Sequence, residues 1–172
     1  PVNTEAEWKL LTEGLNKLGR KAKEMGMQLT YHHHMGTGVQ TSGEIDRLME
    51  QTDPALVGLL YDSGHLVFSG EDPMAVLQKW MGRIRHVHLK DVRADKREMA
   101  ISQKWSFLKG VLEGVFTVPG DGCIDFKPIL DALIKAGYQG WWVVEAEQDP
   151  AKANPLEYAM KARAYIRNTA GI

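Results

Sequence analysis

The sequence has only one cysteine, Cys123, so no disulfide can form within the chain. It also lacks an excess of charge of either sign, because 21 Lys and Arg residues face 22 Asp and Glu residues. Without a broad positive field, nucleic acid and anionic membrane surfaces are not expected partners. There is no apolar run long enough to span a bilayer and no signal-peptide pattern. These absences predict a cytoplasmic protein.

Four short apolar segments, each of which predicts a β-strand, alternate with segments that predict helices. The expected strands are MQLTYHH, LVGLLYD, IRHVHLK and WWVVEAE. The first helix is expected over residues 4–25, where Trp8, Leu11, Leu15, Leu18 and Ala22 recur at helical spacing between Thr4 as cap and Gly26 as stop. Further helices are expected from Ser42 to before Pro54, after Asp72-Pro73, after Asp125 and after Asn154-Pro155.

This alternation predicts an α/β fold with a parallel sheet, either covered on both faces or closed into a barrel. The first three strands begin near residues 27, 56 and 83. That spacing corresponds to one βα unit of about 30 residues. A long segment from Val92 to Cys123 delays the fourth strand. We expect this segment to be a lid or a binding loop, since long connections in compact domains are usually functional.

All six histidines lie in or directly after the first three expected strands: His32, His33, His34, His65, His86 and His88. The carboxyl ends of parallel strands are where α/β proteins build their sites. Side chains two residues apart on a strand share a face, which groups His32 with His34 and Glu145 with Glu147. Buried charges of this kind each cost several kcal/mol unless they are compensated, and a divalent cation compensates them directly.

The strongest candidate for a metal site takes one residue from each of the four successive strand ends: His32, Asp62, His88 and Glu145. Any single histidine is more often an ordinary core or surface residue, and we keep that interpretation for His33. For His86 a supporting role is favoured. Glu147 as a salt-bridge partner and Asp91 as a turn residue are left open.

Five motifs in order, YHHHMGTG, LLYDSGH, IRHVHLKDVR, FTVPGDG and VVEAEQDP, resemble those of the inosose dehydratase family within the xylose isomerase-like TIM-barrel superfamily. The resemblance covers nearly the whole chain. It implies a TIM (β/α)8 barrel of which these residues form the C-terminal half, with four βα units. It also implies that His32, Asp62, His88 and Glu145 bind a divalent metal, although many relatives have Glu at the first of these positions.

The resemblance implies a metal-dependent lyase that dehydrates 2-keto-myo-inositol to a trihydroxycyclohexane-dione in inositol catabolism. His34 and His65 would then supply the acid and the base, in an order that the sequence does not decide. Lys90 would stabilise developing negative charge, or else form an internal salt bridge. Glu147 and Asp121 would hold substrate hydroxyls. Mn²⁺ or Co²⁺ is the expected metal, and the ligand types are also compatible with Zn²⁺.

The same kinds of residues are also found in proteins of other functions. A sugar isomerase or epimerase could use the same metal and begin with the same proton removal. A phosphodiesterase related to AP endonucleases is disfavoured by the net charge of −1. A metal-binding or transport module without catalysis would place its ligands in one flexible tract. Because half a barrel exposes strand edges, we expect an N-terminal half or a second copy in a homo-oligomer to cover them.

Overall fold

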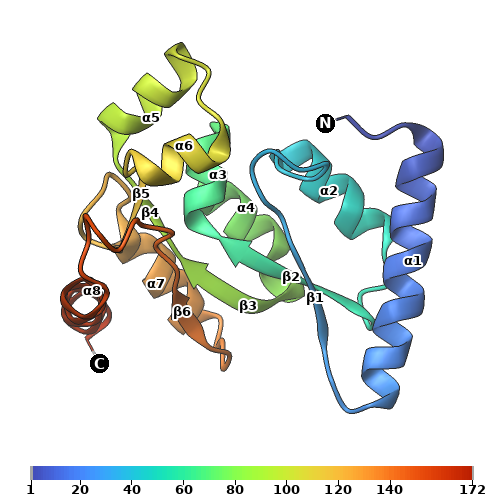
Figure 1. The fold of residues 1–172 in the computed structure, drawn as a ribbon. Coiled ribbons are helices and arrows are strands. Elements are labelled where there is room, and N and C mark those ends of the chain that lie inside the picture. The colour runs from blue at the N-terminus through green and yellow to red at the C-terminus, as the bar shows by residue number, and fades with distance from the viewer. Residues whose placement is uncertain (1, 172) are drawn as a thin grey trace.

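A four-stranded parallel sheet forms the centre of the computed structural model, which describes residues 2–171. The strands are β1 (Leu29–His32), β2 (Val57–Asp62), β3 (Ile84–Leu89) and β6 (Trp142–Val144). Their order in the sheet, β1-β2-β3-β6, follows their order in the chain (Figure 1). The predicted parallel sheet is therefore confirmed, and its four strands are those expected from the sequence.

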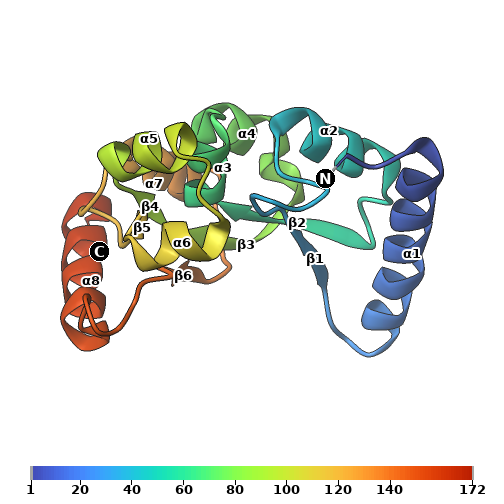
Figure 2. The ribbon, with the colours of Figure 1, turned by 45° about the horizontal axis from the view of Figure 1, so that its top comes forward.

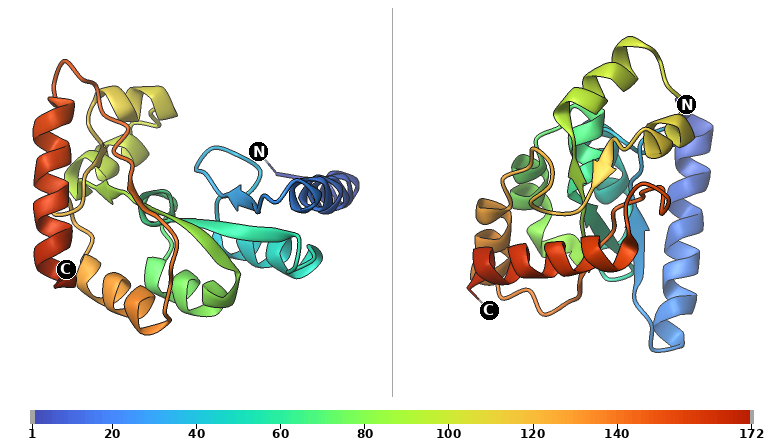
Figure 3. Two further views of the ribbon diagram at one scale, coloured as in Figure 1. Left: turned by 90° about the horizontal axis from the view of Figure 1, so that it is seen from below. Right: turned by 60° about the vertical axis from the view of Figure 1, so that its left-hand side comes forward.

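The helices before and after these strands pack around the sheet. They are α1 (Glu5–Glu24), α2 (Ser42–Gln51), α3 (Ser63–Ser69), α4 (Pro73–Trp80), α7 (Phe126–Lys135) and α8 (Pro155–Ala170). A 3-10 turn over Met81–Arg83 connects α4 to β3. Helices α1 and α8 lie at opposite ends of the molecule (Figure 2), while α4 and α7 lie side by side on one face of the sheet (Figure 3, left). Helix α3, directly after β2, was not expected from the sequence.

Side chains that bond to free backbone N–H groups fix where the helices begin. The cap residues are Thr4, Thr41, Asp72, Asp125 and Asn154. Each oxygen acceptor satisfies a donor that has no partner inside the helix, so the predicted helix starts are confirmed. On the apolar side of α1, Trp8 is buried, whereas Leu18 is 55% exposed.

Alternation along the strands separates the core from the site. Val57, Leu59 and Tyr61 of β2 are fully buried in the core beneath the outer helices. Asp62 takes the opposite face, and so does His88 of β3, with which it is paired in the register. The concave face of the sheet therefore collects polar side chains because of the two-residue period of a strand.

The segment from Val92 to Cys123 forms a small folded unit. It contains α5 (Ala94–Ser102), α6 (Phe107–Leu112) and an antiparallel pair of β4 (Asp91–Val92) with β5 (Phe116–Thr117). A second apolar cluster, built on the buried residues Val92, Ala100, Val115 and Phe116, stabilises it. The sequence therefore predicted the position of this segment but not its helices.

Asp91 lies at the start of this unit and is buried. Its carboxylate accepts hydrogen bonds from the backbone N–H groups of Val92, Gly120, Gly122 and Ile124. These contacts support the turn-residue interpretation of Asp91. Among residues 2–171, no helix is both long and apolar enough to cross a membrane.

Candidate metal and acid–base site

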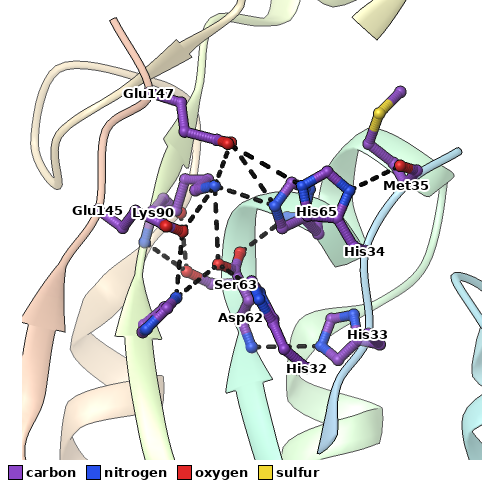
Figure 4. Close-up of polar contacts among 11 residues, drawn as sticks. His32, His33, His34, Met35, Asp62, Ser63, His65, Lys90, Glu145 and Glu147 are labelled. Carbon is purple, nitrogen blue, oxygen red and sulfur yellow. Dashed lines mark hydrogen bonds and ion pairs between the residues drawn. The ribbon is translucent and has the colours of Figure 1, made fainter. Parts of the chain in front are cut away.

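The four residues predicted to bind metal come together at the carboxyl ends of the parallel strands. One potential ligand atom from each residue lies within 4.8 Å of the others. We call this group the cation cluster; its members are His32, Asp62, His88 and Glu145. His32 ends β1, Asp62 ends β2, His88 belongs to β3, and Glu145 follows β6 directly. Three of them are labelled in the close-up of Figure 4.

The distances within the cation cluster fit a bound divalent ion. Asp62 Oδ2 lies 3.4 Å from His32 Nε2 and 3.4 Å from His88 Nδ1. Glu145 Oε2 lies 3.1 Å from His88 Nδ1. Ligand atoms bonded to one ion at about 2.0–2.2 Å lie roughly 3–3.5 Å apart. In addition, His32 Nε2 and Asp62 Oδ2 are buried without a hydrogen-bond partner among the described residues, as expected where lone pairs face a cation.

Local contacts leave one oxygen of Asp62 free to face this point. Asp62 caps helix α3, because its Oδ1 accepts the backbone N–H of His65 at 2.9 Å. The backbone N–H of Asp62 donates a hydrogen bond to Nε2 of the buried His33 at 3.2 Å. The middle imidazole of the histidine run therefore turns away from the site and supports the strand end that carries Asp62.

Opposite charges within the cation cluster shift the pKa values of its residues. Burial opposes ionisation of Asp62, but the imidazoles of His32 and His88 and the ammonium of Lys90 outweigh it, so the pKa of Asp62 lies well below its usual value. A hydrogen bond with His88 is the largest cause that lowers the pKa of Glu145 to about 2. Although burial acts against it, the same carboxylates raise the pKa of His88 to about 9. Both carboxylates are therefore ready to bind a cation at neutral pH.

A second group, the acid–base cluster, consists of His34, His65 and Glu147. The rings of the two histidines lie 3.8 Å apart between centroids. Glu147 lies 3.9 Å from His34 Nε2 and 3.6 Å from His65 Nε2. Simple strand alternation does not explain this placement, because β6 ends at Val144 and Glu147 has a left-handed backbone with φ of 43°. This turn directs its carboxylate toward the histidines (Figure 4).

Lys90 connects the two clusters. It is fully buried, and its Nζ lies 2.8 Å from Glu145, 2.9 Å from His65 Nε2 and 3.8 Å from Asp62. It also forms an ion pair with Glu147. The internal salt bridge considered from the sequence is thus present.

The surroundings shift the pKa values of the two imidazoles of the acid–base cluster in opposite directions. The interaction with Glu147 raises the pKa of His34 above its usual value. Burial lowers the pKa of His65 to about 3, and the nearby charge of Lys90 acts in the same direction. For Glu147, burial raises the pKa, but bonds with His34 and Lys90 prevail and lower it. The cluster therefore holds a carboxylate beside one imidazole that gains protons easily and one that stays neutral.

Two aromatic side chains from the segment 92–123 form a wall beside the acid–base cluster. The ring of Phe107 lies 4.9 Å from that of His34, and the ring of Phe116 lies 5.4 Å from that of His65. Neither residue was predicted from the sequence to lie at the site. The only available signal was the aromatic content of KWSFLKG and of the FTVPGDG motif.

Two other residues considered from the sequence lie outside these clusters. The Asp121 carboxylate is 2.6 Å from Arg93 Nη2, accepts the Thr117 hydroxyl at 2.7 Å and pairs with Lys161. Protein groups therefore already surround the residue predicted to bind substrate. The His86 ring packs 5.3 Å from that of His88, which is compatible with a supporting role.

A parallel βα sheet with a site at its carboxyl edge is typical of α/β proteins, both barrels and open sheets. Residues 1–169 match the family described as the xylose isomerase-like TIM barrel, and the chain belongs to this family. The four βα units correspond to half of the eight in a complete barrel.

The relatives are longer than this chain. The inosose dehydratase of Geobacillus thermodenitrificans is 66% identical over 172 residues, which cover 100% of this chain and 58% of that protein. The inosose dehydratase of Clostridium tetani is 64% identical, with the same coverage. A solved sugar phosphate isomerase/epimerase from Parabacteroides distasonis has a TM-score of 0.72 over 99% of this chain and 54% of that one. At 21% identity, this last likeness shows the fold alone.

Proposed function

We propose that this chain supplies the catalytic strand ends of an inosose dehydratase. Such a hydro-lyase removes water from 2-keto-myo-inositol, or scyllo-inosose, and forms a trihydroxycyclohexane-dione in inositol catabolism. Identity of 66% to a protein of that name supports the proposal. The observation that carries it is the contact of one buried ammonium, that of Lys90, with both the cation cluster and the acid–base cluster.

The proposed reaction needs one base and one acid. Elimination of water begins when a base removes the proton on the carbon next to the ketone, and it ends when an acid protonates the departing hydroxyl. His34 and His65 provide two imidazoles with ring centroids 3.8 Å apart. We assign one to each role. Glu147 orients both rings and binds a substrate hydroxyl.

The cation cluster would hold a divalent metal, with Mn²⁺ or Co²⁺ favoured and Zn²⁺ compatible. When bound, that ion supplies Lewis-acid polarisation of the substrate carbonyl. Lys90 adds a fixed positive charge beside the oxygen on which negative charge develops. Asp121 would bind substrate only after release from its ion pairs with Arg93 and Lys161.

A complete site requires cover for the open sheet. In residues 2–171, β1 and β6 each have a neighbour on one side only. We propose that further βα units of a longer protein, or a second copy of the chain, pair with these edges. The substrate would then be enclosed in a barrel, and such enclosure excludes water from the reaction.

The decisive test uses the full-length protein that contains this chain. It is incubated with 2-keto-myo-inositol and Mn²⁺ or Co²⁺, and the product is followed by the absorbance of the conjugated dione and by mass. Loss of one water supports the proposal. A product of unchanged mass would instead assign a sugar isomerase or epimerase. No conversion with either metal, in a protein shown to bind it, would refute the dehydratase assignment.

A further inference from the structure

The two residues between Asp62 and His65 contact Lys90. The Oγ of Ser63 donates a hydrogen bond to the backbone carbonyl of Lys90 at 2.7 Å and accepts the backbone N–H of Lys90 at 3.1 Å. Both residues are fully buried. One hydroxyl of helix α3 therefore satisfies both backbone groups of Lys90 just after strand β3 (Figure 4).

Gly64 provides space for the Lys90 side chain. A Cβ atom added to Gly64 would lie 2.4 Å from Cγ and 2.7 Å from Cδ of Lys90. Carbon atoms in favourable contact are about 3.5–4.0 Å apart, so no side chain fits at this position while Lys90 keeps its path. Gly64 lies within helix α3, whose backbone other residues adopt readily. Steric space, rather than backbone conformation, therefore requires glycine here.

We infer that Ser63 and Gly64 are positioning residues that form a slot for Lys90. Ser63 fixes the backbone of Lys90, and Gly64 lets its aliphatic stem pass over the first turn of α3. The ammonium then lies 2.8 Å from Glu145 and 2.9 Å from His65 Nε2. In the motif Asp62-Ser63-Gly64-His65, the first residue thus belongs to the cation cluster and the last to the acid–base cluster. The two residues between them position Lys90.

The inference rests on the proposed function, because the slot is taken to hold the Lys90 ammonium in the position where it acts during turnover. A lysine side chain is flexible and loses about 2 kcal/mol of rotamer entropy when it is fixed. Without the slot, the ammonium is free to pair with only one of the two carboxylates, Glu145 or Glu147, that it now contacts together. A misplacement of about 1 Å in an active site can reduce the rate roughly 100-fold.

The chain contains a matched control for the glycine. Helix α2 also begins with a Ser-Gly pair, Ser42 and Gly43, in the same two helix positions as Ser63 and Gly64. A Cβ on Gly43 meets no atom within 4 Å. The substitutions G64A and G43A therefore differ in steric surroundings while the local helix chemistry is shared. For the serine, S69A is the control, since the buried Oγ of Ser69 has no hydrogen-bond partner among the described residues.

The test compares G64A with G43A, and S63A with S69A, in the full-length protein. Turnover of 2-keto-myo-inositol, the affinity for Mn²⁺ alone and the melting temperature are measured. We expect G64A and S63A to lose about 100-fold in kcat while Mn²⁺ affinity stays close to that of the wild type. G64A is expected to melt about 3–10 °C lower, as overpacked cores do. G43A and S69A should behave like the wild type.

A stability comparison tests the slot without any turnover. G64A is combined with K90M, which keeps atoms at the γ and δ positions, and with K90A, which removes them and keeps only the Cβ, 2.8 Å from the added atom. The melting temperature should fall more in the K90M background than in the K90A background. Equal falls, or a G64A protein that melts and turns over like G43A, would overturn the inference. So would a loss of Mn²⁺ affinity that parallels the loss of turnover, since the pair would then support Asp62 instead.

Two further outcomes remain interpretable. If the wild type binds Mn²⁺ but dehydrates nothing, the proposed function fails, while the melting-temperature comparison still decides whether the slot exists. If G64A does not fold, the comparison of S63A with S69A decides the role in turnover.

Discussion

Glu145 Oε2 lies 2.8 Å from the Nζ of Lys90, a lysine with no solvent exposure. Glu145 belongs to the cation cluster, whereas Lys90 also contacts His65 of the acid–base cluster. The two clusters are therefore parts of one charged network. Because they share this contact, experiments must separate loss of metal from loss of proton transfer.

Replacement of Asp62 by Asn should remove metal binding and keep the fold. The amide retains an oxygen to cap helix α3 at His65 but loses the charge that faces His32 and His88. We expect Mn²⁺ affinity to fall by more than about 100-fold, since even residues that only support ligands change affinity by about 10–100-fold. Calorimetric titration with Mn²⁺ measures the effect.

The control for that variant is D72N, which alters the equivalent cap of helix α4 outside the site. It should bind Mn²⁺ like the wild type. Equal affinity in D62N and D72N would show that the cation cluster does not hold the metal.

Replacement of His34 by Asn should reduce turnover and leave metal binding intact. The imidazole contacts Glu147 and His65 but is not a member of the cation cluster. Loss of a general acid or base typically costs a factor of about 10²–10⁴, so turnover should fall by that amount while Mn²⁺ binding persists. H86N alters an imidazole near the cation cluster but outside both groups, so it should lose much less activity than H34N. Turnover in H34N at the wild-type rate would remove His34 from the mechanism.

Phe107 offers a test of the role of the segment 92–123. Its ring packs against His34 at 4.9 Å, whereas the next residue, Leu108, is 63% exposed. F107A should lower kcat by about 2- to 10-fold, because aromatic contacts worth about 0.5–1.5 kcal/mol are lost beside the reacting groups. L108A should have no effect. If both variants keep full activity, the segment does not shape the acid–base cluster.

Acid should destabilise the metal-free protein through its buried histidines. Burial lowers the pKa of His33 to about 4 and that of His65 to about 3, below the value of 6.5 that they have when exposed. Between pH 6.5 and pH 4, the unfolded chain binds protons at these residues and the folded chain does not. The free energy of unfolding should therefore fall as pH decreases, by about 2 kcal/mol for each histidine at pH 5.

Urea unfolding in the presence of EDTA measures this dependence. The raised pKa of His88, about 9, contributes stability that is complete below pH 6.5 and is lost toward pH 9, outside this window. H33Q should roughly halve the slope between pH 6.5 and pH 5. A slope that does not change in H33Q would show that His33 ionises normally in the folded protein.

Much of the fold could be predicted because its signals are local. The caps at Asp72, Asp125 and Asn154 act on backbone groups within three residues, so the sequence itself marks the helix starts. Helix α5 was not predicted, and its N-cap residue Arg93 makes no side-chain cap bond; α6 was not predicted either, although the Ser106 side chain caps it by accepting the backbone N–H of Lys109. Helix α3 was missed because Asp62 had been interpreted only as a ligand, although its other oxygen caps this helix.

By itself, the sequence determined the parallel order of strands and the residues at their carboxyl ends, because a strand has a two-residue period and parallel strands end at one edge. Only the tertiary structure decided how those residues divide into two clusters around Lys90. The ion pair of Lys90 with Glu147 joins residues 57 positions apart and depends on a left-handed turn that strand alternation does not predict. The passage of Lys90 over Gly64 depends on the packing of β3 against α3, which no short stretch of sequence encodes.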